Sequence, residues 1–398
     1  MATLPAERKP LAELTLRAGS ARSAIEPFMV MDVMVAAAAR EAAGHRVIHM
    51  EVGQPATPAP RAAREAVKRL IDSDNLGYTL ALGTDPLRAR IARLYRDWYG
   101  LDVAPNRIVV TAGSSGAFIL AFLTLFDTGA RVALPAPGYP CYRHILSALG
   151  QVPVALETGP ATRWMPTAAQ IAAEAAGGGL DGVLIASPAN PTGTMLEPAR
   201  LAEIARGCRE RGLWLVSDEI YHGLAYGMEQ ASALQFNDDA IVINSFSKYF
   251  SMTGWRVGWM VVPERIVRVI ERLAQNLFIC APAISQAAAL AAFDGLDELE
   301  ANKRVYRANR ELLMTEMPRA GFDNLVPADG AFYLYADVSA QTDDAGQFAR
   351  RMLDETGVAA TPGLDFDPAR GRHFMRFSYA RSTADMTEAV RRLQAWRR

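Results

Sequence analysis

Residues 182–221 read "GVLIASPANPTGTMLEPARLAEIARGCRERGLWLVSDEIY", which is an apolar run, a helical pattern and a second apolar run. The runs "GVLIASP" and "LWLVSDE" lack the alternation of polar and apolar residues that marks a strand with one solvated face. Each run is therefore predicted to be a strand buried on both faces, and the amphipathic segment between them a crossover helix. This strand–helix–strand unit predicts a parallel sheet.

The same alternation of apolar runs and helical patterns begins near Asn106. Further strand-like runs are "IVVT" (108–111), "RVALP" (131–135), "VPVAL" (152–156) and "AIVINSF" (240–246). We expect a large, doubly wound, mostly parallel α/β domain over residues 51–295. The strand-like "GAFYLYADV" and "HFMRFSYA" flank a helical pattern near the C-terminus. They predict a smaller α/β domain over residues 296–398, to which residues 1–50 contribute.

Composition and charge exclude several classes of protein. The 398 residues carry 42 Lys and Arg against 43 Asp and Glu, so no net field attracts nucleic acid or an anionic membrane. The longest apolar run, "AFILAFLTLF", is too short to span a bilayer, and the N-terminus lacks the order of a signal peptide. Three cysteines far apart in sequence predict neither a disulfide framework nor a metal site, and favour a reducing cytoplasm. The expected partners are small molecules and a second copy of the chain.

Polar residues follow four of the apolar runs, where ligands bind in an open parallel sheet. The run "IVVT" leads into "AGSSGA", small residues that open a helix and suit a phosphate, although a tight turn is the ordinary reading. "GVLIASP" leads into Asn190, which could equally be a turn residue. Asp218 ends "LWLVSD", where a carboxylate is costly to bury without a cation, unless it caps the next helix.

The fourth place is the stretch "SFSKYFSMTGWRVGW" (245–259), in which Lys248 and Arg256 lie among aromatic residues. A solvated lysine is the usual explanation, but the aromatic neighbours argue against a wet, open surface. Together the four places match one ligand. A phosphate needs a helix N-terminus, hydroxyls and an arginine; a ring nitrogen needs a carboxylate; a phenolate oxygen needs donors; an aldehyde needs an amine. The sequence thus predicts a site for pyridoxal phosphate.

The chain from about Ala24 to its C-terminus resembles the class I/II aminotransferases of the fold type I pyridoxal-phosphate enzymes. The resemblance rests on eight motifs in order: "GQP", "YTLALGTDPLR", "TAGSSGA", "PGYPCY", "SPANPTG", "SDEIY", "SFSKYFSMTGWRVGW" and "MRFSYA". It implies that Lys248 forms a Schiff base with the cofactor and later moves the substrate proton, while Asp218 holds the pyridinium nitrogen. It also implies that Asn190 and Tyr221 bond the ring 3-oxygen and that Tyr139 stacks on the ring.

The resemblance implies further contacts to the phosphate and to the substrate. The phosphate ligands would be Gly113, Ser114, Ser115, Ser245 and Arg256, with Tyr78 reaching over from a second subunit. Arg376, helped by Asn190 and the backbone at Gly53, would take the substrate α-carboxylate. The matching role of Tyr78 implies a homodimer.

The resemblance predicts an aminotransferase that moves an amino group from an L-amino acid to a 2-oxo acid. Ser115 stands where some aspartate-specific relatives have lysine, and the segment "NLFICAPAISQ" (276–286), expected near the partner's pocket, is apolar. Both features favour a neutral amino donor, while the particular donor, acceptor and pathway stay open. The alternatives are another reaction on the same scaffold, such as C–S β-elimination, or a sensor without activity. "GGGLDG" (177–182) matches GxGxxG but precedes a strand, which argues against a dinucleotide site.

Overall fold

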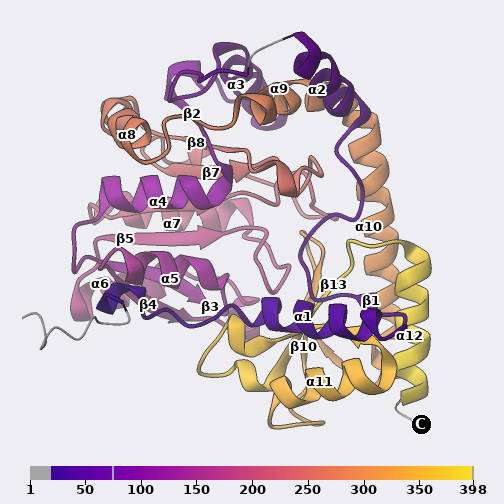
Figure 1. Ribbon diagram of the computed structural model, residues 1–398. Coiled ribbons are helices and arrows are strands. Elements are labelled where there is room, and N and C mark those ends of the chain that lie inside the picture. The colour runs from indigo at the N-terminus through magenta and orange to yellow at the C-terminus, as the bar shows by residue number, and fades with distance from the viewer. Residues whose placement is uncertain (1–18, 74–75, 397–398) are drawn as a thin grey trace, which may run out of the picture.

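The computed structural model describes residues 19–73 and 76–396. Its larger part is built around a seven-stranded sheet, and helices lie against this sheet (Figure 1). The strand order is β2-β8-β7-β6-β5-β3-β4. The strands are β2 (Ile108–Thr111), β3 (Arg131–Ala136), β4 (Val152–Glu157), β5 (Gly182–Ala186), β6 (Trp214–Asp218), β7 (Ile241–Ser245) and β8 (Gly258–Val261). All six runs predicted as strands within this sheet are strands, and the mostly parallel α/β architecture is confirmed.

Strand β8 is antiparallel to both of its neighbours, β2 and β7, and the sequence analysis did not predict it. The chain leaves β7 at Ser245 and returns beside it, so that Ser245 pairs with Gly258. Because a hairpin-like return begins and ends at the same sheet edge, the connecting segment 246–257 stays at the carboxyl end of β7. Lys248 and Arg256 both lie on this segment.

Helices cover both faces of the large sheet. On one face lie α4 (Gly113–Leu125), α5 (Pro140–Ala148) and α8 (Glu264–Leu277), and on the other α3 (Asp85–Tyr99), α6 (Ala168–Gly178), α7 (Pro198–Glu210) and α9 (Ala283–Ala292). Side chains of β5 alternate between the two cores, with Val183 and Ile185 on one side and Leu184 on the other. This two-sided burial explains why the strands are apolar throughout.

The smaller part of the molecule is built around a four-stranded antiparallel sheet, ordered β12-β13-β10-β9. Its strands are β9 (Asn324–Leu325), β10 (Tyr333–Asp337), β12 (Thr361–Pro362) and β13 (Phe374–Ser378), and a separate parallel pair joins β1 (Ile48–His49) to β11 (Val358–Ala359). The accompanying helices are α1 (Met29–Ala42), α10 (Leu296–Glu316), α11 (Ala345–Thr356) and α12 (Thr383–Trp396), and α2 (Arg61–Ser73) packs on α9.

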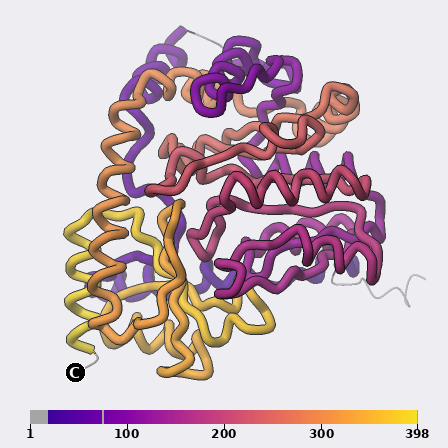
Figure 2. Tube along the Cα trace, turned by 180° about the vertical axis from the view of Figure 1, so that it is seen from behind, coloured from indigo at the N-terminus to yellow at the C-terminus, as the bar shows by residue number. Residues whose placement is uncertain are grey.

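The N-terminal and C-terminal segments lie side by side in both views (Figures 1 and 2), and α1 contacts β11 and β12. These contacts support the proposed domains, 1–50 with 296–398 and 51–295 between them, although residues 1–18 lie outside the described residues. Within the described ranges, no helix combines the length and apolarity needed to cross a membrane, and no cluster of metal-ligating side chains occurs.

Candidate active site

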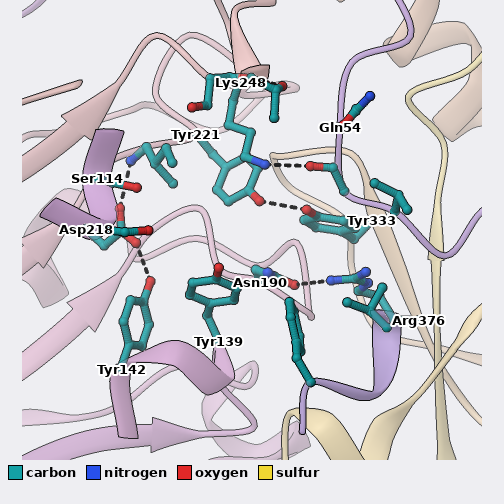
Figure 3. Close-up of a pocket in the computed structure, with 18 of the residues that line it drawn as sticks. Gln54, Ser114, Tyr139, Tyr142, Asn190, Asp218, Tyr221, Lys248, Tyr333 and Arg376 are labelled. Carbon is teal, nitrogen blue, oxygen red and sulfur yellow. Dashed lines mark hydrogen bonds between the residues drawn. The ribbon is translucent and has the colours of Figure 1, made fainter. Parts of the chain in front are cut away.

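A pocket lies at the carboxyl ends of β5, β6 and β7, where the small sheet meets the large one (Figure 3). Ten residues singled out from the sequence line it: Gly53, Ser114, Ser115, Tyr139, Asn190, Asp218, Tyr221, Lys248, Arg256 and Arg376. Gly113, Ser245 and Tyr78 are not among the lining residues. The structure therefore gathers residues that are up to several hundred positions apart into one site.

Lys248 projects its amine into the pocket, where Nζ donates a hydrogen bond to the carbonyl oxygen of Gly53 at 2.5 Å. Desolvation, followed by the positive charges of Arg376 and Arg256, lowers the pKa of Lys248 to about 7. A substantial fraction of this amine is neutral near pH 7, and a neutral amine is the form that attacks an aldehyde.

Asp218 ends strand β6 and is 3% exposed. Its carboxylate accepts hydrogen bonds from the Tyr142 hydroxyl and, at 3.0 Å, from the backbone amide of Ile220. Burial raises the pKa of Asp218 to about 6, and these two hydrogen bonds oppose the rise. None of the described Lys or Arg side chains makes an ion pair with it, so a buried carboxylate faces the pocket with capacity for a cationic partner.

The first turn of α4 lies opposite Arg256, and Ser114 and Ser115 of this turn line the pocket together with Arg256. Gly113 has a φ of +73°, and a Cβ there would lie 2.5 Å from Nη2 of Arg256. Only glycine allows the helix to start this close to the guanidinium. Free amides at a helix start, two hydroxyls and an arginine suit a phosphate dianion.

Ser245, expected to bind the phosphate, lies one layer behind the pocket. Its hydroxyl donates to the carbonyl of Val257 at 3.1 Å and is 2.8 Å from the hydroxyl of Ser247. It also accepts from the backbone amide of Ser247 at 3.1 Å. Ser247 lines the pocket, and the sequence signal for it was its position beside Lys248, so the role of Ser245 toward the phosphate stays a prediction.

Arg376 projects from β13 and is 2% exposed. Nη1 donates to Oδ1 of Asn190 at 2.9 Å, and Nη2 donates to the carbonyl of Glu51. Its guanidinium carbon lies 4.5 Å from the ring centre of Tyr333. Nε has no partner among the described residues. A guanidinium held this firmly at the pocket wall is suited to a carboxylate, which it can bind with two parallel hydrogen bonds.

Tyr221 faces the pocket beside Lys248, with Nζ 5.7 Å from the ring centre. Its hydroxyl is 2.7 Å from that of Tyr333, which lies on β10 of the small sheet. Tyr139, at the start of α5, contacts Phe28 edge-to-face at 6.1 Å. The contact between the hydroxyls of Tyr221 and Tyr333 thus links the turn after β6 to the small sheet across the site.

Two predicted partner-subunit contributions lie away from this pocket in the single chain. Tyr78 is 84% exposed, and no residue of 276–286 lines the pocket. Within the single chain, an apolar wall comes from the N-terminal segment, through Phe28, Val30, Met31 and Met34. Sequence analysis missed this wall because nothing local in "PFMVMDVMV" shows which distant surface it covers.

Behind Asp218 lies a buried polar network outside the pocket. Oε1 of Glu219 accepts from the hydroxyls of Ser217 and Ser232 and from the amide of Ala233, at 3.1, 3.0 and 2.8 Å. Burial raises the pKa of Glu219 to about 8 and lowers that of His222 to about 3. His222 is therefore neutral and supports the site from behind.

The groups that line this pocket fit pyridoxal phosphate. The pocket contains the Lys248 amine, whose pKa is lowered, and the buried Asp218 carboxylate, which has no ion-pair partner among the described residues. It also contains the helix start at Gly113 that faces Arg256. They match, respectively, the aldehyde, the protonated ring nitrogen and the phosphate of that molecule. The arginine at the opposite wall leaves room for an amino acid carboxylate.

Comparisons with known proteins agree with this geometry. Residues 45–393 match the family described as "Aminotransferase class I and II". The chain is 48% identical to a valine–pyruvate aminotransferase of Mycobacterium tuberculosis, over 94% of this chain and 97% of that protein. A crystal structure of an aminotransferase from M. tuberculosis matches with a TM-score of 0.94 at 47% identity, covering 96% and 99% of the two chains. Thermus thermophilus aspartate aminotransferase with maleate matches with a TM-score of 0.89 at 28% identity, covering 96% and 100%.

Proposed function

This chain belongs to the class I and II aminotransferases, and we propose that its preferred amino donor is a neutral, apolar L-amino acid. The enzyme is a pyridoxal-phosphate-dependent transaminase with the fold type I architecture, and it moves an amino group from an amino acid to a 2-oxo acid. The proposal concerns which side chain the pocket selects and which residues perform each task.

We assign the cofactor contacts as follows. Ser114, Ser115 and Arg256 would hold the phosphate, Asp218 would hold the protonated ring nitrogen, and the Lys248 amine would bond the aldehyde carbon with loss of water. The bound cofactor supplies an electron sink for the pair left on the substrate Cα when its proton departs. Lys248 is the lysine among the described lining residues, and its pKa is lowered to about 7, so part of its amine is available as a nucleophile and base near pH 7.

Substrate orientation is assigned to Arg376 and Asn190. Because Oδ1 of Asn190 already accepts from Arg376, the amide NH2 of Asn190 is left as a donor toward the pocket. The same hydrogen bond holds the guanidinium plane for the substrate α-carboxylate. With the carboxylate fixed, the Lys248 amine, freed when the substrate's own amine takes its place on the aldehyde carbon, would be placed to move the proton from Cα to that carbon.

The observation that carries the donor proposal is the composition of the wall. Phe28, Val30, Met31 and Met34 are apolar, and the described lining residues include no cation besides Lys248, Arg256 and Arg376. Each of these three has a task already. A second substrate carboxylate would be dehydrated without a partner, which costs several kcal/mol. The similarity to a valine–pyruvate aminotransferase supports the same conclusion.

The test is a series of single-turnover half-reactions with alanine, valine, leucine, phenylalanine, methionine, glutamate and aspartate. Conversion of the cofactor to its amine form is followed by absorbance, and the 2-oxo acid product is assayed. We expect the best apolar donor to exceed aspartate in kcat/KM by at least about tenfold, or about 1.4 kcal/mol. If aspartate is the best donor, a cation from another part of the assembly reaches the wall and the proposal is wrong.

We also propose that the enzyme is a homodimer in which Tyr78 of one subunit serves the phosphate of the other. Tyr78, Leu80, Leu277 and Ile279 are apolar or aromatic side chains at least 49% exposed in the single chain. Exposed apolar surface of this kind is typical of a subunit interface.

We further propose a cytoplasmic location. The three described cysteines are all free, which supports it.

A further inference from the structure

The N-terminus of α1 is capped by a residue from the opposite end of the chain. The backbone amides of Met29 and Val30 donate to Oδ1 and Oδ2 of Asp365 at 2.8 and 2.9 Å. Phe28, at the N-cap position, makes no side-chain cap hydrogen bond of its own. Asp365 lies in the 3₁₀ turn Gly363–Asp365 and is 3% exposed. The first turn of α1 is therefore tied to the C-terminal segment through one carboxylate.

This first turn also carries the apolar wall of the pocket. Val30, Met31 and Met34 lie on it and on the next turn, and Phe28 directly precedes it. Only Val30 and Ala37 are buried in the whole helix, and Met31 is 52% exposed. So little side-chain burial leaves the two cap bonds as a principal restraint on where the start of α1 lies.

The carboxylate has a second physical effect at the same place. Free amides at a helix start, together with the helix dipole, attract anions. Asp365 occupies two of these amides and brings a negative charge. The capped helix consequently presents apolar side chains, without an anion-binding end beside them.

We propose that Asp365 is a positioning residue for substrate specificity: by capping α1 it holds the wall of Phe28, Val30, Met31 and Met34 against the donor's side chain. This inference rests on the proposed assignment of that wall to the donor side chain. Asp365 is not among the pocket-lining residues, so it acts through α1.

Comparing kcat/KM for two amino donors distinguishes a displaced wall from a general loss of activity. Alanine, with a methyl group, needs little from the wall, whereas valine or leucine must contact it. Loss of orientation at Arg376 would lower the rates of both donors equally, because both carry the same α-carboxylate. In Asp365→Ala, the ratio of kcat/KM for the best branched donor to that for alanine should fall by at least about fivefold.

Asp344 supplies a matched control. It also caps a helix through two backbone amides: as the N-cap residue of α11, its Oδ1 accepts from the amides of Gly346 and Gln347 at 2.9 and 3.0 Å, and it does not line the pocket. Asp344→Ala should lower the melting temperature while leaving the branched-to-alanine ratio within about twofold of wild type. Asp365→Asn keeps one acceptor oxygen, so its branched-to-alanine ratio of kcat/KM should lie between those of wild type and Asp365→Ala. This variant replaces Asp365→Ala in the test if the alanine variant does not fold.

Hydrogen exchange gives a readout that is independent of activity. The amides at the start of α1 should exchange faster in the Asp365 variants than in wild type and in Asp344→Ala. An unchanged donor ratio in a folded Asp365 variant, whatever its exchange pattern, overturns the inference. The wild-type donor series judges the proposed function separately, because a preference for aspartate there would leave the effect of Asp365 on the ratio measurable.

Discussion

The hydroxyl of Tyr142 donates a hydrogen bond to the buried carboxylate of Asp218. Tyr142 lies on α5 and Asp218 at the end of β6, so the bond joins a covering helix to the sheet edge. Burial and the nearby Asp218 charge raise the pKa of Tyr142, which keeps the phenol protonated as a donor. The hydrogen bond stabilises the ionised carboxylate and orients its free lone pairs.

Removing this donor should make Asp218 harder to ionise. Since the bond lowers the pKa of Asp218, which burial has raised to about 6, Tyr142→Phe should raise that pKa further. Cofactor affinity should then begin to fall at a higher pH than in wild type when pH is lowered from about 8 to about 5. The measurement is cofactor binding to the apo-protein across this range. Asp218→Asn is the control, because it should show no such transition, and superimposable profiles for Tyr142→Phe and wild type would refute the role.

The lowered pKa of Lys248 predicts a pH-dependent stability of the apo-protein. Below about pH 7 the amine is charged in both the folded and the unfolded protein. Burial of this charge then lowers the free energy of unfolding by its full amount. Between about 7 and about 10.5 the unfolded state binds the extra proton, so the stability contributed at this position rises with pH. Lys248→Met should therefore raise the melting temperature of the apo-protein below pH 7, and this advantage should shrink as pH rises. A difference that stays constant with pH would mean that the amine titrates normally.

Arg376→Lys should impair all donors alike. Lysine keeps the charge but cannot reproduce the planar fork or the simultaneous bonds to Asn190 and to the Glu51 carbonyl. We expect a loss of about 2 kcal/mol or more in kcat/KM, similar for every amino acid tested. Steady-state kinetics with the donor series measures it. A loss confined to acidic donors would indicate that Arg376 binds the side-chain carboxylate of the donor and not its α-carboxylate.

Shared sites predict complementation between two damaged chains. If Tyr78 serves the partner's phosphate, a hybrid dimer of Tyr78→Ala and Lys248→Ala chains carries one site with both defects and one with neither. Co-expression with two different tags, followed by isolation of hybrids, should restore activity toward half that of the wild-type dimer. The Lys248→Ala homodimer should be almost inactive, because no amine bonds the cofactor. A hybrid no more active than its parents would show that each site is built from one chain.

Local patterns in the sequence were sufficient for the large sheet and for the residues at its strand ends. Apolar runs without alternation specify strands buried on both faces, and the ends of such strands must meet at one edge. That is why Asn190, Asp218 and Lys248 could be placed in one site from their positions after "GVLIASP", "LWLVS" and "AIVINSF".

The antiparallel strand β8 could not be read from the same patterns. "VGWMVVP" (257–263) is an apolar run with three valines and a tryptophan, but it continues directly from the segment that carries Lys248 and Arg256, and local pattern does not give the direction of a strand. Its place between β2 and β7 depends on pairing with both strands. The hydrogen bond from the Ser245 hydroxyl to the carbonyl of Val257 could not be predicted for a related reason, since it depends on how the chain returns along β8.

What the sequence by itself determined is the large sheet and the polar groups at its strand ends that line the pocket, because strand burial and strand ends are encoded by neighbouring residues. What only the tertiary structure decided is how those groups are held and what the pocket selects. Tyr142 reaches Asp218, Tyr333 reaches Tyr221, and Asp365 caps a helix 335 residues earlier in the chain. Such contacts join side chains whose sequence neighbours carry no information about each other, and they form only when the packed sheets bring distant segments together.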